Sequence, residues 1–287
     1  MADTAGTPRT RALASALRRA RTSAGYGVRE VANKLDMSHT TISQWETGKR
    51  VPCLEDLSAM LTAIGLTGRR RDVILDLARD VPSPNWLTAG IPGLAQQLEG
   101  VIECERTATE IINWSPLQVP GILQTAEYAT AIIGSDDALT KAEVETRVNL
   151  RVHRREATAN RDNREPVEYT ALVGEWALRQ RVGGKAVLTE QLKHLVASTE
   201  EARFTVQVVP ISEHWHPGLA GPFLLFNFED AASIVHLEHH RSGVFLYDDG
   251  DVKAYKMAAA VVGRAALSPA DSVTFINSLI KKLEKNP

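Results

Sequence analysis

The sequence predicts a multidomain protein, with an all-α N-terminal domain of five helices followed by an α+β domain. Apolar residues recur at helical spacing through residues 10–81, and this segment holds no strand-like run. From residue 86 onward, short runs of β-branched and aromatic residues alternate with helical patterns. A chain of 287 residues suits two domains of ordinary size. We therefore expect domains at 10–81 and 86–287.

The helices of the first domain follow from apolar spacing and from the residues that end or begin a helix. Gly25 and Gly48 are expected to stop the first and third helices. Ser38 is a good N-cap for the third, because its hydroxyl accepts a backbone N–H of the first turn. The pattern predicts helices over 12–23, 28–35, 38–46, 54–64 and 73–78.

The second domain follows a linker at 82–85, where two prolines prevent a helix from continuing. Composition predicts strands over 111–114, 167–173, 204–209, 222–228, 233–237 and 243–247. Helices are expected over 94–105, 141–156 and 189–198, and a last helix opens at Ser268. Residues 247–250, with two aspartates and a glycine, read as a turn.

Composition places the chain among ordinary globular proteins. It is 44% hydrophobic and 24% charged, and it contains no apolar run long enough to cross a membrane. The first residues lack the apolar stretch of a secretory signal. Cys53 and Cys104 match no disulfide framework and no zinc-ligand spacing. We expect a cytoplasmic protein without a cofactor.

Charge is distributed unevenly along the chain. Residues 1–80 hold 13 Lys/Arg and 9 Asp/Glu, which leaves 20 and 26 for the remainder. The N-terminal domain, here called the head, is therefore basic, and the C-terminal domain, here called the body, is acidic. This distribution favours a polyanionic partner for the head alone.

One continuous stretch carries the strongest functional signal. Residues 17–25 lead into the segment VANKLDMSHTTISQWETGKRVP at 31–52. This stretch resembles the XRE-type, phage-repressor-like helix-turn-helix family. The resemblance implies a lambda-repressor-like fold that binds a double-stranded DNA operator, and hence a nucleoid-associated protein. It also implies that Arg21 pairs with Glu46 and ties the first helix to the end of the third.

The third helix is the element that this class places in the major groove. Ile42 and Trp45 point inward, and the outward polar positions are expected to contact bases: His39, Thr40, Ser43 and Gln44. A second set is better placed for phosphates: Ser38, Thr41, Lys49, Arg50 and Arg29.

The sequence departs from this family at two positions. The family usually has a glutamine that opens the second helix and touches the DNA backbone, whereas this chain has Val28. The turn usually carries glycine where this chain has Asp36, although aspartate tolerates left-handed backbone better than most residues. We expect a normal fold with weaker DNA binding.

The body is similar to the C-terminal domain of the actinobacterial WhiJ-like regulators. The residues that carry this similarity lie at 118–129, 173–179, 207–210 and 218–223. The resemblance implies a regulator of development or secondary metabolism, often encoded beside a small partner protein that binds the C-terminal domain. We expect a homodimer whose body receives a small-molecule effector or that partner.

Two other interpretations of the body stay open. Five histidines gather at 214, 216, 236, 239 and 240, which suggests either a metal site or, as we favour, a polar strand edge and loop. Four charged residues suggest a cleft for group transfer or for action on a nucleotide: Glu175, Arg179, Glu238 and Arg241. No nucleophile elbow, phosphate-binding glycine loop or metal triad accompanies them, so we expect no enzyme. A further alternative is a protein-interaction, antitoxin-like module.

Overall fold

The computed structural model describes residues 8–79, 86–89, 100–159, 165–211, 214–229, 231–239 and 242–285. The chain folds into two compact units. The first comprises Met1–Cys104 with His239–Tyr247, and the second comprises Glu105–Glu238 with Asp248–Pro287. Among the described residues, no helix is both long and apolar enough to span a membrane.

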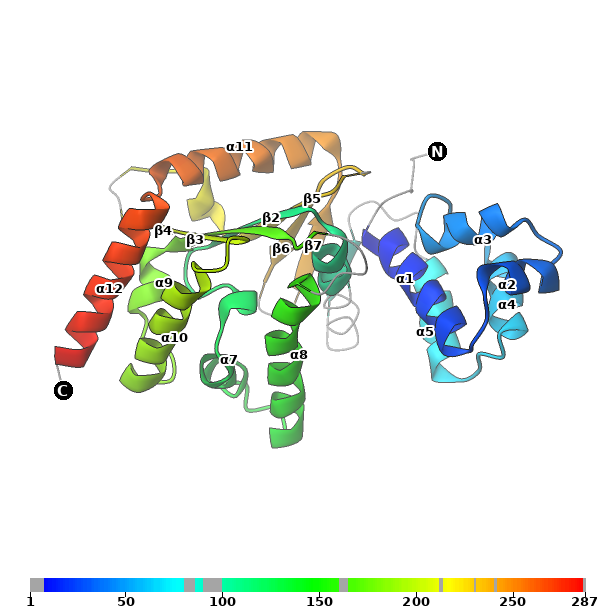
Figure 1. The fold of residues 1–287 in the computed structure, drawn as a ribbon, viewed down its shortest axis with the longest axis horizontal. Helices are drawn as coiled ribbons and strands as arrows, with labels where there is room; N and C mark the ends of the chain where they lie inside the picture. Colours follow the sequence, from blue (N-terminus) through cyan, green and yellow to red (C-terminus); the bar gives the residue numbers. More distant parts are fainter. Residues whose placement is uncertain are drawn as a thin grey trace. The chain divides into compact units, whose positions relative to one another are not determined.

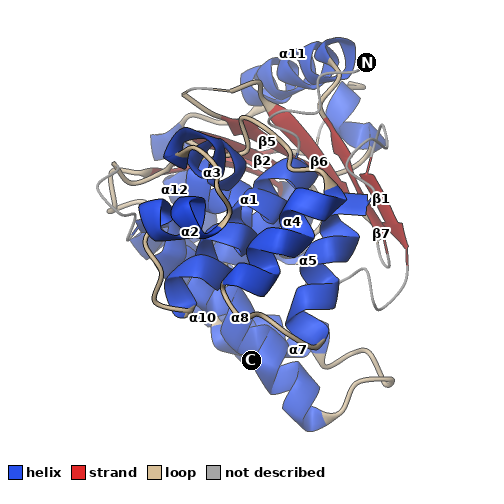
Figure 2. Cartoon of the chain, turned by 90° about the vertical axis from the view of Figure 1, so that its right-hand side faces the viewer, coloured by secondary structure: helices blue, strands red, loops and turns tan. Residues whose placement is uncertain are grey.

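The head of the first unit is a bundle of short helices joined by loops (Figure 2). They are α1 (Pro8–Ser23), α2 (Val28–Lys34), α3 (His39–Glu46), α4 (Leu54–Ala63) and α5 (Arg69–Arg79). All five helices expected from the sequence are present, and α1 and α5 begin four residues before the predicted starts. The prediction of an all-α first domain is thus confirmed.

The head buries one apolar core to which each of its helices contributes. The side chains that lie fully inside include Leu17 of α1, Val31 of α2, Ile42 of α3 and Leu57 of α4. Trp45 is only 2% exposed, and it lies one helical turn after Ile42. The α3 helix has only eight residues, so its stability comes from this packing rather than from the helix itself.

Local chemistry sets the ends of α3. The Thr41 N–H donates to Ser38 Oγ over 3.1 Å, so Ser38 is the N-cap. Gly48 follows the helix with φ +70°, a left-handed backbone conformation that favours glycine. Asp36 has φ +52°, so the turn between α2 and α3 does require left-handed backbone.

The first unit also contains a strand pair. Strand β1 (Trp86–Ala89) pairs antiparallel with β7 (Ser242–Leu246). The β7 strand was predicted, but β1 was not, because four residues are too few for a periodic signal. Residues 100–107 are helical, which agrees with the second half of the helix expected at 94–105. The predicted linker at 82–85 lies outside the described residues.

The second unit is built on a mixed sheet in the order β6–β5–β2–β3–β4. Strands β2, β3 and β4 run parallel, β5 is antiparallel to β2, and β6 is antiparallel to β5. Their bounds are Glu110–Ser115 (β2), Glu168–Gly174 (β3), Phe204–Val209 (β4), Phe223–Asn227 (β5) and Ile234–Glu238 (β6). These strands match the predicted segments within two residues, which confirms an α+β body.

Helices cover both faces of this sheet (Figure 1). One face packs against α7 (Ala126–Ile133), α8 (Lys141–Ala159) and α10 (Lys185–Ser198). The opposite face is covered by α11 (Asp249–Ala265). Two short 3-10 turns, η1 (Gly121–Leu123) and η2 (Pro217–Ala220), and the short helix α9 (Glu175–Arg179) complete the connections.

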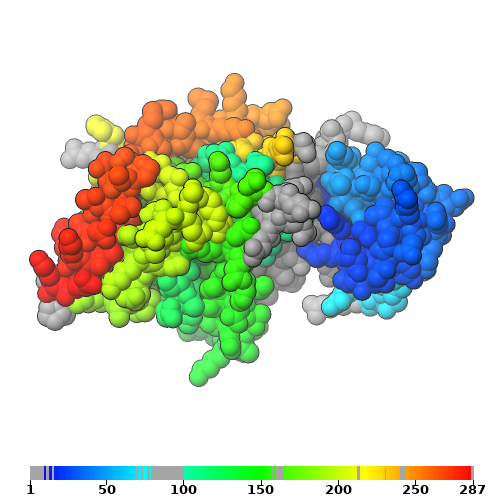
Figure 3. Space-filling view, viewed as in Figure 1, coloured from blue at the N-terminus to red at the C-terminus, as the bar shows by residue number. Residues whose placement is uncertain are grey.

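The last helix, α12 (Pro269–Lys285), lies beside α10 (Figure 3). It also packs against the edge strand β4. The Val208 N–H donates to Ser272 Oγ over 2.9 Å, and the Leu267 N–H donates to the Val208 carbonyl over 2.8 Å. Backbone groups of the edge strand are therefore satisfied within the chain, which blunts pairing with another strand.

The turn predicted at 247–250 is wrong. Asp248 caps a helix instead, since its carboxylate accepts the Gly250 N–H over 2.9 Å, and α11 then runs for 17 residues. Aspartate and glycine are common in turns, but acidic residues equally favour the first turn of a helix. The α7 helix was also missing from the prediction.

The left-handed turn residue yields a stability prediction. Asp36→Gly should stabilise the head by about 1 kcal/mol, because glycine adopts this backbone conformation without steric cost. Amide hydrogen exchange at the buried positions Leu17 and Ile42 in the full chain measures the change. Asp36→Ala is the matched control and should give no gain. Equal stabilisation by both variants would contradict the assignment of strain to this turn.

Candidate nucleic-acid interface

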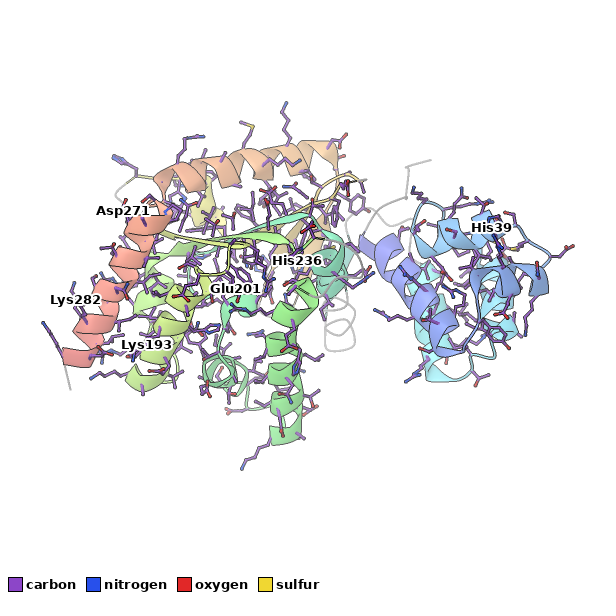
Figure 4. All side chains as sticks on the ribbon, viewed as in Figure 1. His39, Lys193, Glu201, His236, Asp271 and Lys282 are labelled. Carbon is purple, nitrogen blue, oxygen red and sulfur yellow. The ribbon has the colours of Figure 1, made fainter. Side chains whose placement is uncertain are left out.

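The α3 helix divides into an inward apolar side and an outward polar side. Ile42, Trp45 and Glu46 are buried, whereas His39, Thr40 and Ser43 are exposed; Figure 4 labels His39 at the start of the helix. Gln44 is half-buried, and none of the described residues forms a hydrogen bond with its side-chain amide. The four residues expected to contact bases therefore lie together on one strip of α3.

A buried ion pair fixes this helix to α1. Arg21 Nε donates to Glu46 Oε1 over 2.6 Å, and Arg21 Nη2 donates to Glu46 Oε2 over 2.9 Å. Arg21 Nη1 also donates to the Tyr26 carbonyl over 2.7 Å. The two side chains are 9% and 5% exposed, so the two-pronged pair lies away from water.

The residues expected to contact phosphate fall into two groups. Lys49, Arg50 and Arg29 are exposed, and their cations face solvent. The Ser38 and Thr41 hydroxyls instead lie 2.9 Å apart and share a hydrogen bond within the helix cap. These two hydroxyls are therefore partly occupied in the free protein.

One outward position of the strip was missed from the sequence. Thr47 is exposed directly after α3, and its hydroxyl donates to the Ser43 carbonyl over 2.9 Å. The helical spacing that selects Ser43 and Gln44 would also have selected Thr47, since it lies one turn further on.

The departure at Val28 has a structural basis. Val28 opens α2 and packs, partly buried, against the core of the head. The Gly27 N–H donates to the Glu30 carboxylate over 2.6 Å, which satisfies the helix start without a polar first residue. The position thus contributes packing where a glutamine would offer a polar side chain.

The four charged residues proposed as a cleft do not come together. Glu175 accepts hydrogen bonds from Arg179 Nε over 2.6 Å and from the Ile211 N–H over 3.0 Å. Glu238 lies at the end of β6, which β5 and β2 separate from β3, so these two strands are roughly 14 Å apart. Arg241 lies outside the described residues.

The late histidines are also dispersed. His216 is buried and meets Trp114 edge to face, with ring centroids 5.7 Å apart, on the α11 side of the sheet. The register places His236 on the opposite face, while His214 and His239 are exposed. His240 is outside the described residues. Within the described part of the chain, no three His, Cys, Asp or Glu side chains gather in a way that could hold a metal ion.

A buried polar cluster lies between the sheet and α8. Arg154 Nε donates to Glu105 Oε2 over 2.8 Å, and Asn113 Nδ2 donates to Tyr169 Oη over 2.8 Å. Burial would lower the pKa of Arg154, but the charge of Glu105 and the hydrogen bonds to it raise the pKa above its usual value. Burial also raises the pKa of Tyr169, so the phenol stays protonated.

His236, labelled in Figure 4, is buried within range of the Arg154 charge and is held neutral. Burial, together with the charge of Arg154, lowers the pKa of His236 to about 4. Neighbouring Arg151 donates to Gln124 Oε1 over 3.1 Å, and burial, with the charge of Arg154, lowers its pKa as well. The positive charge of Arg154 therefore opposes a proton on His236.

The first domain defines the class of protein. Residues 12–74 match the family model described as a helix-turn-helix domain, which is a class of DNA-binding domain. Residues 98–278 match the model described as Domain of unknown function (DUF5753). That match spans more than half of the chain, and the chain belongs to this family. No curated protein and no solved structure matches the chain significantly.

The buried pair predicts a large effect of a small substitution. Glu46→Gln should destabilise the head by about 3 kcal/mol, because it leaves the Arg21 charge buried without its counter-ion. Hydrogen exchange in the full chain measures the loss, read at the head for this variant and at the second unit for the control. Glu190→Gln, which breaks an exposed Lys193 pair, is the matched control and should cost under about 1 kcal/mol. Equal costs for the two variants would refute the role given to the buried pair.

His236 predicts how stability depends on pH. Its folded pKa of about 4 lies below the unfolded value of 6.5, so the unfolded chain binds the proton more readily between these values. The contribution of His236 to the free energy of unfolding is therefore fully present above pH 6.5. It falls by about 3 kcal/mol as the pH drops to 4. Urea unfolding of the full chain at a series of pH values measures this slope.

His236→Leu should flatten the slope, although a smaller contribution of the same sign from His194 remains, because burial lowers its pKa too. An unaltered slope in His236→Leu would show that the protonation responsible occurs elsewhere.

Proposed function

We propose that this chain is a sequence-specific, double-stranded-DNA-binding transcriptional regulator of the XRE type. One observation carries the proposal: α3 is locked to α1 by the buried Arg21–Glu46 pair and presents an uninterrupted polar strip outward. A helix of this kind enters the major groove, where its side chains reach base edges. The strip then reads sequence while the rest of the head positions it.

The chemistry of the strip suits direct reading of bases. A glutamine amide matches the donor and acceptor of adenine, a histidine N–H donates to guanine, and hydroxyls accept either partner. Gln44, His39, Thr40 and Ser43 supply these groups from α3. The exposed cations Lys49, Arg50 and Arg29 supply the phosphate contacts that set affinity and register.

The body supports a regulatory role in this proposal. A chain with one reading helix gains affinity and specificity as a homodimer on two half-sites about one helical turn apart. The body would join the two copies and receive a small ligand or a small partner protein. A coupling of about 1 to 3 kcal/mol between that input and the spacing of the heads is enough to change operator occupancy. The proposal includes action in the cytoplasm as a repressor or an activator, without catalysis.

Base reading by Gln44 gives the central test. Gln44→Ala should relax the preference at one base pair of the operator by about 1 to 3 kcal/mol, because the bidentate contact is lost. Selection of bound sequences from a random DNA pool, with wild-type and variant full chains, measures the preference at every position.

Lys49→Met serves as the matched control. It removes a phosphate contact, so it should weaken all sequences alike and reduce the slope of log affinity against log salt by about 1. If the wild-type chain selects no sequence from the pool, the proposed function is wrong. If Gln44→Ala keeps the full preference, another residue reads that base pair.

A further inference from the structure

A cavity of about 540 Å³ lies between α11 and the sheet of the second unit. Its floor comes from adjacent strands whose register brings Ile112 of β2 beside Leu225 of β5. Leu172 of β3 and Phe228, which follows β5, extend the same apolar surface. A volume of this size lies within the range that holds small organic ligands.

The helix over this floor presents mainly small side chains. Lys256, Ala259, Ala260 and Gly263 line the cavity at the spacing of one helical face. A Cβ atom built on Gly263 would meet no other atom within 4 Å. The open volume therefore lies beside α11, where this face of the helix carries small side chains.

Most polar groups at the cavity are already paired within the protein. Asn227 Nδ2 donates to Glu110 Oε2 over 2.6 Å, and Asn227 Oδ1 accepts from Ser233 Oγ over 2.7 Å. Gln207 Nε2 donates to the Leu267 carbonyl over 2.9 Å. These groups lie at the polar end of the cavity, and few of its polar side chains are left to bond a ligand.

Two lining groups stay available among the described residues, the Thr170 hydroxyl and the Lys256 ammonium, for which the structure has no side-chain partner. Lys256 is exposed, so its ammonium lies on the solvent side of the cavity. The cavity thus combines an apolar interior with one cation at its opening. Charge complementarity therefore favours an occupant that is mostly apolar and carries one negative charge.

We infer that this cavity binds a small apolar molecule that carries a single carboxylate. The apolar part packs between α11 and the strands, and the carboxylate meets the Lys256 ammonium. The inference deepens the proposed function and rests on it for its biological meaning, since such a molecule would be the effector. Binding itself is independent of DNA and is tested without it.

Calorimetric titration of the full chain with decanoate, and with the uncharged decan-1-ol, tests the site. Decanoate should bind with one molecule per chain at concentrations below about 1 mM, and decanol should bind more weakly. Gly263→Leu places a larger side chain at the cavity wall, where its Cβ atom meets no other atom, and should weaken both probes at least about tenfold. Ala254→Leu adds the same bulk at an exposed position of α11 outside the cavity and should leave both affinities unchanged.

The lysine is tested by a matched pair on the same helix. Lys256→Met should weaken decanoate by about threefold to fivefold and leave decanol unchanged, as expected for an exposed charge pair. Lys253→Met, at an exposed position outside the cavity, should change neither probe.

Three results would overturn the inference. They are no binding of decanoate by the folded chain, binding that survives Gly263→Leu, and equal affinities for both probes that Lys256→Met does not alter. The sequence-selection experiment contains no decanoate, so it fails or succeeds separately. Probe binding by a chain that selects no DNA sequence would leave the cavity assigned and remove the regulator.

Discussion

The geometry of the head depends on the buried pair between Arg21 and Glu46. Two short hydrogen bonds hold α3 at one angle to α1, and a third bond from Arg21 reaches the Tyr26 carbonyl before α2. Burying two charges costs free energy, and an apolar pair of equal size often stabilises a fold as well. An apolar pair, however, does not fix the relative orientation of the two helices. The guanidinium and the carboxylate meet in one orientation, and this orientation sets where the polar strip of α3 points.

The body places different chemistry on the two faces of one sheet. On the face covered by α8, Glu105, Arg154 and Tyr169 form a polar layer whose charges and hydrogen bonds are met inside the protein. Such a layer is rigid, because each lost partner would leave a buried group unsatisfied. On the face covered by α11, small residues leave open volume. The polar layer on the α8 face stabilises the fold, whereas the α11 face leaves volume that a ligand can occupy.

Sequence alone predicted the head and the strands well because these elements have strong periodicity. Once Ile42 and Trp45 are assigned to the core, helical spacing leaves His39, Thr40 and Ser43 outward. The Arg21–Glu46 pair followed from the family resemblance and not from spacing, since 25 positions separate its members.

What the sequence could not predict depends on contacts between distant segments. Glu105 and Arg154 meet across 49 positions, and neither residue differs in sequence from an ordinary surface charge. The α11 helix was missed because its first residues read as a turn and its middle is rich in alanine, which gives little contrast between its faces. The cavity beneath it was therefore also beyond prediction.

The order of strands in the body has a consequence for synthesis of the chain. Ile112 of the central strand β2 lies beside Leu225 of β5. More than a hundred further residues must therefore be synthesised after β2 before its neighbour β5 exists. Helical bundles such as the head have mostly local contacts and fold quickly, whereas parallel and distant pairings close slowly. A nascent chain thus carries a finished head on an incomplete sheet with exposed strand edges, the state in which aggregation competes with folding.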